Sequence, residues 1–160
     1  MTRTGFFAGS FDPPTLGHVD LVRRAAALVD ALVIGVGHNA DKRGWIAVEQ
    51  RVELLRELLP GHTVLAFDGL AVDAARAAGA SVLLRGLRGP EDLPGELHMA
   101  RANARLDPEI DTVFLASDPA IAHVSSRLVR EVQRSGGDIE LFVPAAVARF
   151  LNDTPPGDSA

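Results

Sequence analysis

The stretch from residue 9 to residue 18 combines residue types that can bind a phosphate group. It reads GSFDPPTLGH, follows a short apolar run and leads into a stretch with helical periodicity. Gly9 and Gly17 allow the backbone to approach a ligand closely, and the two prolines stiffen the turn between them. Ser10 and His18 should then lie at a helix N-terminus, where backbone N–H groups and the helix dipole favour phosphate. The stretch is therefore predicted to be a nucleotide site.

Two common nucleotide motifs are missing from this stretch. It has neither the Lys-Ser/Thr pair of a P-loop nor the Gly-x-Gly-x-x-Gly fingerprint of a dinucleotide site, so an ordinary P-loop enzyme and an NAD-dependent dehydrogenase are both disfavoured. A simpler interpretation is also open at this point. The stretch could be a Gly/Pro turn in which His18 only caps the helix or packs against it.

Two arginines form a second candidate cluster. Arg85 and Arg88 stand three residues apart around a glycine, directly after the apolar run 81–84. Guanidinium groups bind phosphate oxygens in a forked geometry, so both side chains could serve one anionic ligand. The alternative is a solvated charged loop.

Two further places could contact anions. Ser125 and Ser126 begin a helical stretch, and serine is a good N-cap residue, so capping alone could explain the pair. The same helix start could also hold phosphate groups. Lys42 follows the apolar run 31–36 and is either a surface side chain or a contact for an anionic substrate.

The elements that must position these residues are visible in the apolar pattern. We expect strands at residues 5–8, 31–36, 63–67, 81–84 and 112–115, and helices at 18–29, 48–59, 70–78 and within 91–106. Short apolar strands separated by amphipathic helices indicate βαβ units. We therefore predict an α/β fold, a single doubly wound, Rossmann-like domain with a five-stranded parallel sheet and helices on both faces. In such sheets ligands bind beyond the carboxyl ends of the strands, which is where the candidate residues lie.

Two more helices are expected after the last strand, at about 125–134 and 144–151. The domain is predicted to span residues 1–151. Residues 152–160 contain two Pro, one Gly and two Asp, and are expected to form a flexible C-terminal tail.

Composition limits the function classes. The chain has 160 residues, a net charge of -5 and no cysteine or tyrosine, which excludes thiol or phenol catalysis and zinc-cysteine sites. An acidic chain is not expected to coat nucleic acid or an anionic membrane, so an anionic ligand must be met by a local cluster of Arg, Lys and helix ends. The longest apolar stretch is too short to span a bilayer, and the N-terminus does not read as a signal peptide. We expect a cytoplasmic protein.

Together the motifs resemble a known family. GSFDPPTLGH resembles the Thr/His-x-Gly-His signature of the nucleotidyltransferase α/β phosphodiesterase superfamily, and RGLR at 85–88 and SSRLVREV at 125–132 resemble bacterial phosphopantetheine adenylyltransferase. The resemblance extends from residue 5 to about residue 151. It implies transfer of the adenylyl group of ATP to 4'-phosphopantetheine, giving dephospho-coenzyme A and pyrophosphate. It also implies Mg²⁺ as cofactor and a homohexamer.

The resemblance assigns roles residue by residue. Ser10 and His18 are implied as catalytic, and no protein side chain is implied as a metal ligand. For ATP it implies Ser10, Phe11, His18, Gly86, Leu87, Arg88, Glu96, Ile121, Ala122, His123, Val124, Ser125, Ser126 and Arg127. For phosphopantetheine it implies Ser10, Lys42, Ala71 and Arg85, with Met99, Asn103 and Glu131 as further candidates.

The sequence departs from the family at several of these places. Ile121 and His123 stand where many relatives have an aromatic residue near the adenine. Arg127 replaces a third serine, and Pro94-Gly95 precede Glu96 where relatives begin a helix with bulky or acidic residues.

The expected chemistry needs no protein nucleophile or base. The phosphate of phosphopantetheine is already an anion at neutral pH, so the protein has to place it in line and offset the repulsion between two anions. Two alternatives stay open: a sibling nucleotidyltransferase acting on nicotinamide mononucleotide or glycerol 3-phosphate, and a non-catalytic nucleotide-binding regulator.

Overall fold

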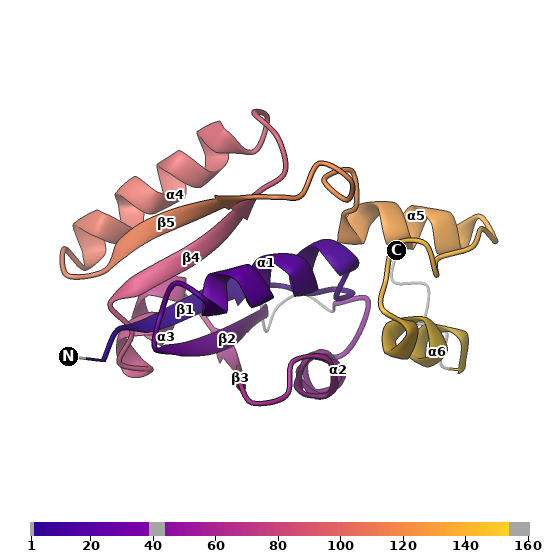
Figure 1. The fold of residues 1–160 in the computed structure, drawn as a ribbon, viewed down its shortest axis with the longest axis horizontal. Helices are drawn as coiled ribbons and strands as arrows, with labels where there is room; N and C mark the ends of the chain where they lie inside the picture. The colour runs from indigo at the N-terminus through magenta and orange to yellow at the C-terminus, as the bar shows by residue number, and fades with distance from the viewer. Residues whose placement is uncertain (1, 39–43, 154–160) are drawn as a thin grey trace.

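Five parallel strands form one sheet in the computed structural model, which describes residues 2–38 and 44–153. The strands are β1 (Thr4–Gly9), β2 (Ala31–His38), β3 (Thr63–Asp68), β4 (Val82–Leu87) and β5 (Asp111–Ala116). Their order in the sheet is β3-β2-β1-β4-β5, and every neighbouring pair is parallel. The predicted five-stranded parallel α/β fold is confirmed (Figure 1).

The helices cover both faces of this sheet. They are α1 (Leu16–Ala26), α2 (Val48–Leu58), α3 (Ala71–Ala77), α4 (Leu93–Leu106), α5 (Ser126–Arg134) and α6 (Ala145–Asp153). Side chains of α1 and α2 pack on one face, and those of α3 pack on the other, where α4 lies beside β5. Figure 1 shows α5 and α6 beyond the carboxyl ends of β1 and β4, and α6 packs against α2.

Strand β1 illustrates why these segments form a central sheet. Phe7 belongs to the apolar core under α1 and α2, whereas Phe6 and Ala8 belong to the core under α3. Because successive side chains of a strand point to opposite faces, a strand covered on both sides must be apolar at every position. The continuous apolar runs of the sequence meet this condition.

The order of the strands creates a crevice at the carboxyl edge of the sheet. β1 lies between β2 and β4. From β1 the chain first builds β2 and β3 on one side, and it then crosses over to place β4 and β5 on the other side of β1. The loops that follow β1 and β4 therefore separate, and a crevice opens at this edge of the sheet.

Three of the boundaries that differ from the sequence prediction bear on the site or on the expected end of the domain. β4 continues to Leu87, so Arg85 lies on the strand and not in the loop after it. α1 begins at Leu16 instead of His18, because Thr15 caps it. α6 continues through Asn152 to Asp153, past the predicted domain end at residue 151, because Leu151 is fully buried and Gln133 donates a hydrogen bond to its carbonyl at 3.3 Å. The rest of the predicted tail, 154–160, lies outside the described residues.

In the part of the chain that the structure describes, no helix is both long and apolar enough to cross a membrane.

Candidate functional site

Two adjoining cavities open at the carboxyl ends of β1 and β4. The first, of about 330 Å³, lies between the loop after β1, the start of α1 and the start of α5. The second, of about 370 Å³, lies between the ends of β1 and β2 and helices α3 and α4. Both volumes are in the usual range for small-molecule sites. Their common wall is formed by Ala8, Gly9, Ser10, Arg85 and Glu96.

Most of the predicted site residues line one or both cavities. The first is lined by Ser10, His18, Arg85, Gly86, Arg88, Glu96, Ile121, Val124, Ser125, Ser126 and Arg127. The second is lined by Ser10, Ala71, Arg85, Glu96, Met99 and Asn103. Four predicted residues, Phe11, Leu87, Ala122 and His123, are in neither lining, and neither is Glu131. Lys42 lies outside the described residues.

Phe11 and His123 have visible reasons to be absent from the linings. The Phe11 side chain is fully buried in the core under α1 and α2, so only its backbone could serve a ligand. Its φ of 49° is unusual for a bulky residue and turns the chain sharply after Ser10. His123 is exposed, and its ring packs edge-on against Phe142 with a centroid distance of 6.2 Å.

Three arginines from three elements hold the end of β1 and the loop that follows it. Arg85 of β4 donates to the carbonyl of Ala8, Arg51 of α2 donates to that of Ser10 at 2.6 Å, and Arg130 of α5 donates to that of Asp12. Every second carbonyl from 8 to 12 thus accepts a hydrogen bond from a guanidinium group. Hydrogen bonds from charged donors are stronger than those between neutral groups, so the loop has a fixed backbone.

The loop in turn orders its neighbours. The Asp12 carboxylate accepts hydrogen bonds from the backbone N–H groups of Trp45 and Ile46, both at 2.8 Å. Ser126 donates its hydroxyl hydrogen to the carbonyl of Pro13 at 2.8 Å, which joins the start of α5 to the same loop. The positions of α2 and α5 relative to the first cavity therefore depend on residues 10–15.

One ring nitrogen of His18 helps to cap the N-terminus of α1. Nδ1 accepts a hydrogen bond from the backbone N–H of Thr15 at 3.0 Å, and the Thr15 hydroxyl accepts one from the backbone N–H of His18 at 3.3 Å. This is a capping box at the N-terminus of α1. The capping role considered from the sequence is therefore real, and it leaves the other ring nitrogen for the cavity.

The cap also fixes where His18 carries its proton. Because Nδ1 accepts from a backbone N–H, it has to be unprotonated, so the hydrogen of the neutral ring is on Nε2. Burial, followed by the positive charges of Arg88 and Arg85, lowers the pKa of His18 from 6.5 to about 4. At neutral pH His18 is consequently an uncharged ring with an Nε2–H donor.

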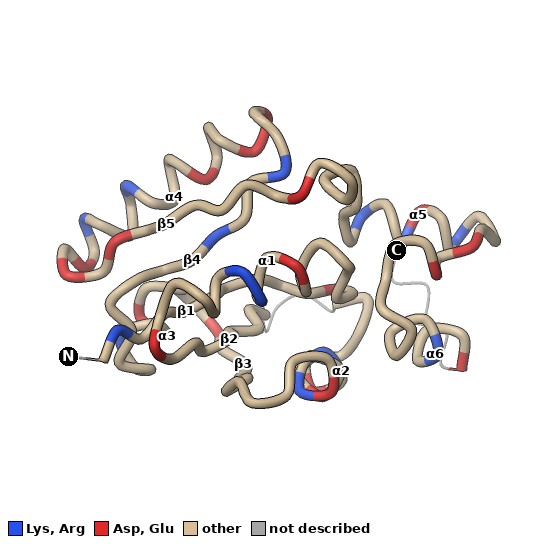
Figure 2. Tube along the Cα trace, viewed as in Figure 1, with Lys and Arg blue, Asp and Glu red and all other residues tan. Residues whose placement is uncertain are grey.

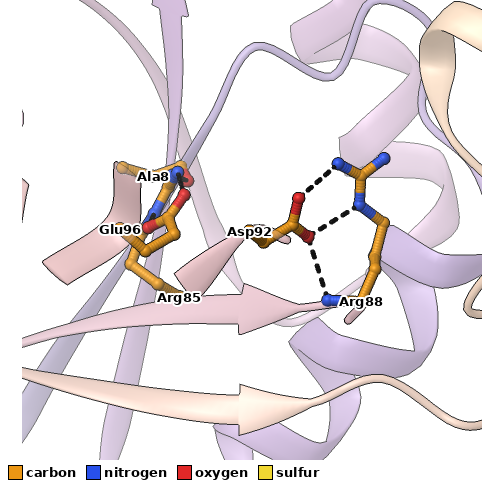
Figure 3. Close-up of polar contacts among 5 residues, drawn as sticks. All are labelled: Ala8, Arg85, Arg88, Asp92 and Glu96. Atoms are coloured by element: carbon orange, nitrogen blue, oxygen red, sulfur yellow. Dashed lines mark hydrogen bonds and ion pairs between the residues drawn. The ribbon is translucent and has the colours of Figure 1, made fainter. Parts of the chain in front are cut away.

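Arg85 is paired with Glu96. Its Nε donates to one carboxylate oxygen at 2.9 Å and its Nη2 to the other at 2.6 Å, while Nη1 reaches the carbonyl of Ala8 (Figure 3). Three of the five N–H bonds of the guanidinium group are used in this way, so two are left for a ligand. Arg85 has been oriented by its partners, and its charge is balanced.

Arg88 is paired in the same manner with Asp92. Figure 2 shows the basic positions on β4 and the turn after it close to acidic positions at the start of α4. The sequence alone suggested a free cluster of positive charge. The structure instead brings each arginine together with a carboxylate, so this wall of the cavity has oriented N–H donors but little net charge.

The start of α5 offers a further set of donors. The Ser125 hydroxyl accepts a hydrogen bond from the N–H of Leu128 at 3.1 Å, which confirms the predicted N-cap. The other N–H groups of the first turn have no partner within a helix and can meet an anion. Arg127, beside them, is largely exposed and forms an ion pair with Glu131 at 2.9 Å.

Sequence reasoning missed four residues that shape the site, namely Asp12, Arg51, Asp92 and Arg130. Arg51 and Arg130 lie 41 and 118 residues away from the carbonyls they hold, and no local pattern could reveal those contacts. Asp92, by contrast, is four residues from Arg88, a spacing at which opposite charges often pair.

Comparison with known proteins identifies the class to which the chain belongs. A family model described as cytidylyltransferase-like matches residues 6–132. A solved structure from Vibrio parahaemolyticus, assigned as a nicotinate-nucleotide adenylyltransferase, aligns with a TM-score of 0.65 at 14% identity and covers 96% of this chain and 93% of its own. That likeness shows the fold alone. Fold and family model together define the class of the protein, a cytidylyltransferase-like nucleotidyltransferase.

Curated relatives narrow the class further. The chain is 46% identical over 154 residues to the phosphopantetheine adenylyltransferase of Lachnoclostridium phytofermentans, covering 94% of both chains. It is 47% identical over 150 residues to that of Rhizorhabdus wittichii, covering 92% of this chain and 91% of the relative. The chain belongs to the phosphopantetheine adenylyltransferase family, which confirms the resemblance inferred from the motifs.

The tautomer and charge of His18 can be tested by NMR. We expect the His18 ring to titrate near pH 4 in the folded protein, against about 6.5 in the unfolded chain. Between these values only the unfolded state binds the proton, so the contribution of His18 to the free energy of unfolding falls as the pH is lowered from 6.5 to 4. The measurement is a pH series of the His18 ring signals, assigned with a His18→Gln variant. A titration midpoint above pH 6 would contradict the buried neutral ring.

Proposed function

We propose that this chain transfers the adenylyl group of ATP to 4'-phosphopantetheine, giving dephospho-coenzyme A and pyrophosphate. The observation that carries the proposal is His18, a neutral Nε2–H donor held by a helix cap in the cavity that Arg85 and Arg88 also line. Family membership supplies the identity of the two substrates.

The two cavities match the two substrates in chemistry. The first presents arginines, His18 and the start of α5, which suits the polyphosphate of ATP. The second is lined by apolar residues such as Phe67, Leu70 and Leu83, which suits the pantetheine arm. The phosphate of phosphopantetheine would then lie at the common wall, beside Ser10 and Arg85, where it faces the α-phosphate of ATP.

The reaction itself is a single displacement at phosphorus. An oxygen of the phosphopantetheine phosphate attacks the α-phosphorus of ATP and forms a new P–O bond. The bond from the α-phosphorus to the oxygen that bridges to the β-phosphate breaks, and pyrophosphate leaves with that electron pair. No proton has to be removed from the nucleophile, so the protein acts by placement and charge stabilisation.

Each residue has one part in this proposal. His18 Nε2–H donates to an oxygen of the α-phosphate, where negative charge grows in the transition state. The remaining N–H bonds of Arg85, together with Lys42, hold the attacking phosphate, and Arg88 and the start of α5 hold the β- and γ-phosphates. Ser10 contributes at the common wall of the cavities.

Magnesium enters this proposal with the nucleotide. Within residues 2–38 and 44–153 no group of three or more His, Asp or Glu side chains could hold a metal ion. We therefore place Mg²⁺ on the ATP phosphates, as part of the substrate, and each step above is carried by the chain's own residues.

A homohexamer in the cytoplasm completes the proposal. Of the seven large apolar side chains that are exposed in the described structure, Leu93, Leu106 and Val113 lie on α4 and the edge strand β5 outside both cavities, on elements that could make subunit contacts. Light scattering of the purified protein should then give about six times the chain mass of 16.9 kDa.

Pyrophosphate release with a panel of acceptors tests the function. The protein, ATP and Mg²⁺ are incubated with 4'-phosphopantetheine, nicotinamide mononucleotide or glycerol 3-phosphate. We expect release only with 4'-phosphopantetheine, because only that acceptor has an arm that fills the second cavity. Release with another acceptor would identify a sibling nucleotidyltransferase. ATP binding without release for any acceptor would identify a regulator.

Substitution of His18 tests the assigned role. His18→Ala should retain the fold and lower turnover with 4'-phosphopantetheine by roughly 10²–10³, the usual size for the loss of one transition-state donor. His62→Ala is a matched control, because His62 lies between α2 and β3, at the other end of the strands. Steady-state kinetics of both variants make the comparison. Near-normal turnover of His18→Ala would remove His18 from the mechanism.

A further inference from the structure

Asp92 holds Arg88 through three hydrogen bonds. Its Oδ2 accepts from the backbone N–H of Arg88 and from Nε, both at 3.0 Å, and its Oδ1 accepts from Nη2 at 2.9 Å (Figure 3). The Asp92 side chain is 18% exposed and that of Arg88 is 45% exposed. The bond from Asp92 to Arg88 raises the pKa of Arg88 and lowers that of Asp92, so the pair is ionised across the physiological pH range.

The carboxylate has no other visible task. Asp92 precedes the first residue of α4, but its side chain makes no capping hydrogen bond there. The helix begins instead with Leu93 and Pro94, and proline is favoured in the first turn. All side-chain hydrogen bonds of Asp92 go to Arg88. Its position is thus explained by the guanidinium group and not by the helix.

The geometry leaves a defined part of Arg88 free. Asp92 takes the edge of the guanidinium formed by Nε and Nη2, and Nη1 donates to no residue that the structure describes. Three of the five N–H bonds are therefore available. Arg88 and Asp92 both line the first cavity, together with His18 and the start of α5. A phosphate bound in that cavity can meet the free end of a guanidinium group that is already fixed.

We propose that Asp92 is a positioning residue for ATP: it fixes the guanidinium of Arg88 so that its free N–H bonds meet the nucleotide's phosphates. This inference rests on the proposed function, since it concerns the same cavity and the same substrate. Asp92 itself touches no reacting atom.

Two opposing effects of Asp92 have to be weighed. Its negative charge reduces the attraction of the cavity for a polyanion, so removal of that charge alone would tighten ATP binding. Its hydrogen bonds immobilise a long side chain that is half exposed, and ordering such a side chain during binding costs up to about a tenfold loss of affinity. Near the surface, water and salt weaken the charge effect. We therefore expect the orienting effect to win.

Asp92→Asn is the variant that tests this expectation, and Glu91→Gln is its matched control. Both remove one negative charge from neighbouring positions, but Glu91 makes no hydrogen bond to Arg88. We expect Asp92→Asn to weaken ATP binding, measured by calorimetry, about five- to tenfold. The kcat/KM for ATP should fall at least as much, with the KM for 4'-phosphopantetheine changed less than twofold. Glu91→Gln should leave ATP affinity unchanged or slightly tighter.

A double-mutant cycle separates positioning from a general structural effect. In an Arg88→Met background, Asp92→Asn should have little further effect on ATP affinity, because no cationic side chain is left at position 88 for Asp92 to orient. Additive losses would overturn the proposal, as would tighter ATP binding in Asp92→Asn or an equal loss in Glu91→Gln. ATP affinity is read without turnover, so these outcomes stand apart from the acceptor test. If the wild-type protein released no pyrophosphate, the proposed function would be wrong. Calorimetry of ATP binding would still test the positioning role of Asp92.

Discussion

The site depends on the hydrogen bonds between arginine side chains and the backbone at the end of β1 and in the loop that follows it. Arg85, Arg51 and Arg130 come from a strand and two helices, and they converge on the carbonyls of Ala8, Ser10 and Asp12. Arg51 is only 4% exposed, and a buried cation is tolerated only where it has strong partners. The loop provides those partners. The same bonds gather three guanidinium groups around one short segment, in a chain whose net charge is -5.

This arrangement resolves a conflict that the composition poses. An acidic protein that binds two phosphorylated substrates needs a local positive potential. Two unpaired arginine side chains close together would, however, repel each other and would not keep one conformation. Arg85 is held by Glu96 of α4, and Arg88 is held by Asp92, the residue before that helix. The cavity therefore offers oriented N–H donors more than net positive charge. Directed N–H donors stabilise a transition state without having to reorganise when charge develops.

Much of the fold could be predicted from the sequence, because the information is local. A strand covered on both faces must be apolar throughout, and the five apolar runs together with the helical stretches between them gave the right elements and the right sheet. Some predicted element boundaries were wrong. The Thr15 cap makes α1 begin at Leu16, two residues before His18, and β4 continues through the charged residue Arg85 to Leu87. The motifs placed Ser10, His18, Arg85 and Arg88 at one edge. They could not reveal contacts over long separations, such as Arg51 with Ser10, nor the burial of the Phe11 side chain.

If the two substrates occupy the two cavities as proposed, the common wall links their binding free energies. Arg85 and Ser10 face both spaces, and Arg85 has only two N–H bonds that are not already used. A ligand that takes them from one side changes what the other side can offer. Because such coupling is reciprocal, the affinity for the nucleotide must depend on the acceptor to the same degree as the affinity for the acceptor depends on the nucleotide. The two substrates are therefore expected to bind with coupled affinities and not independently of each other.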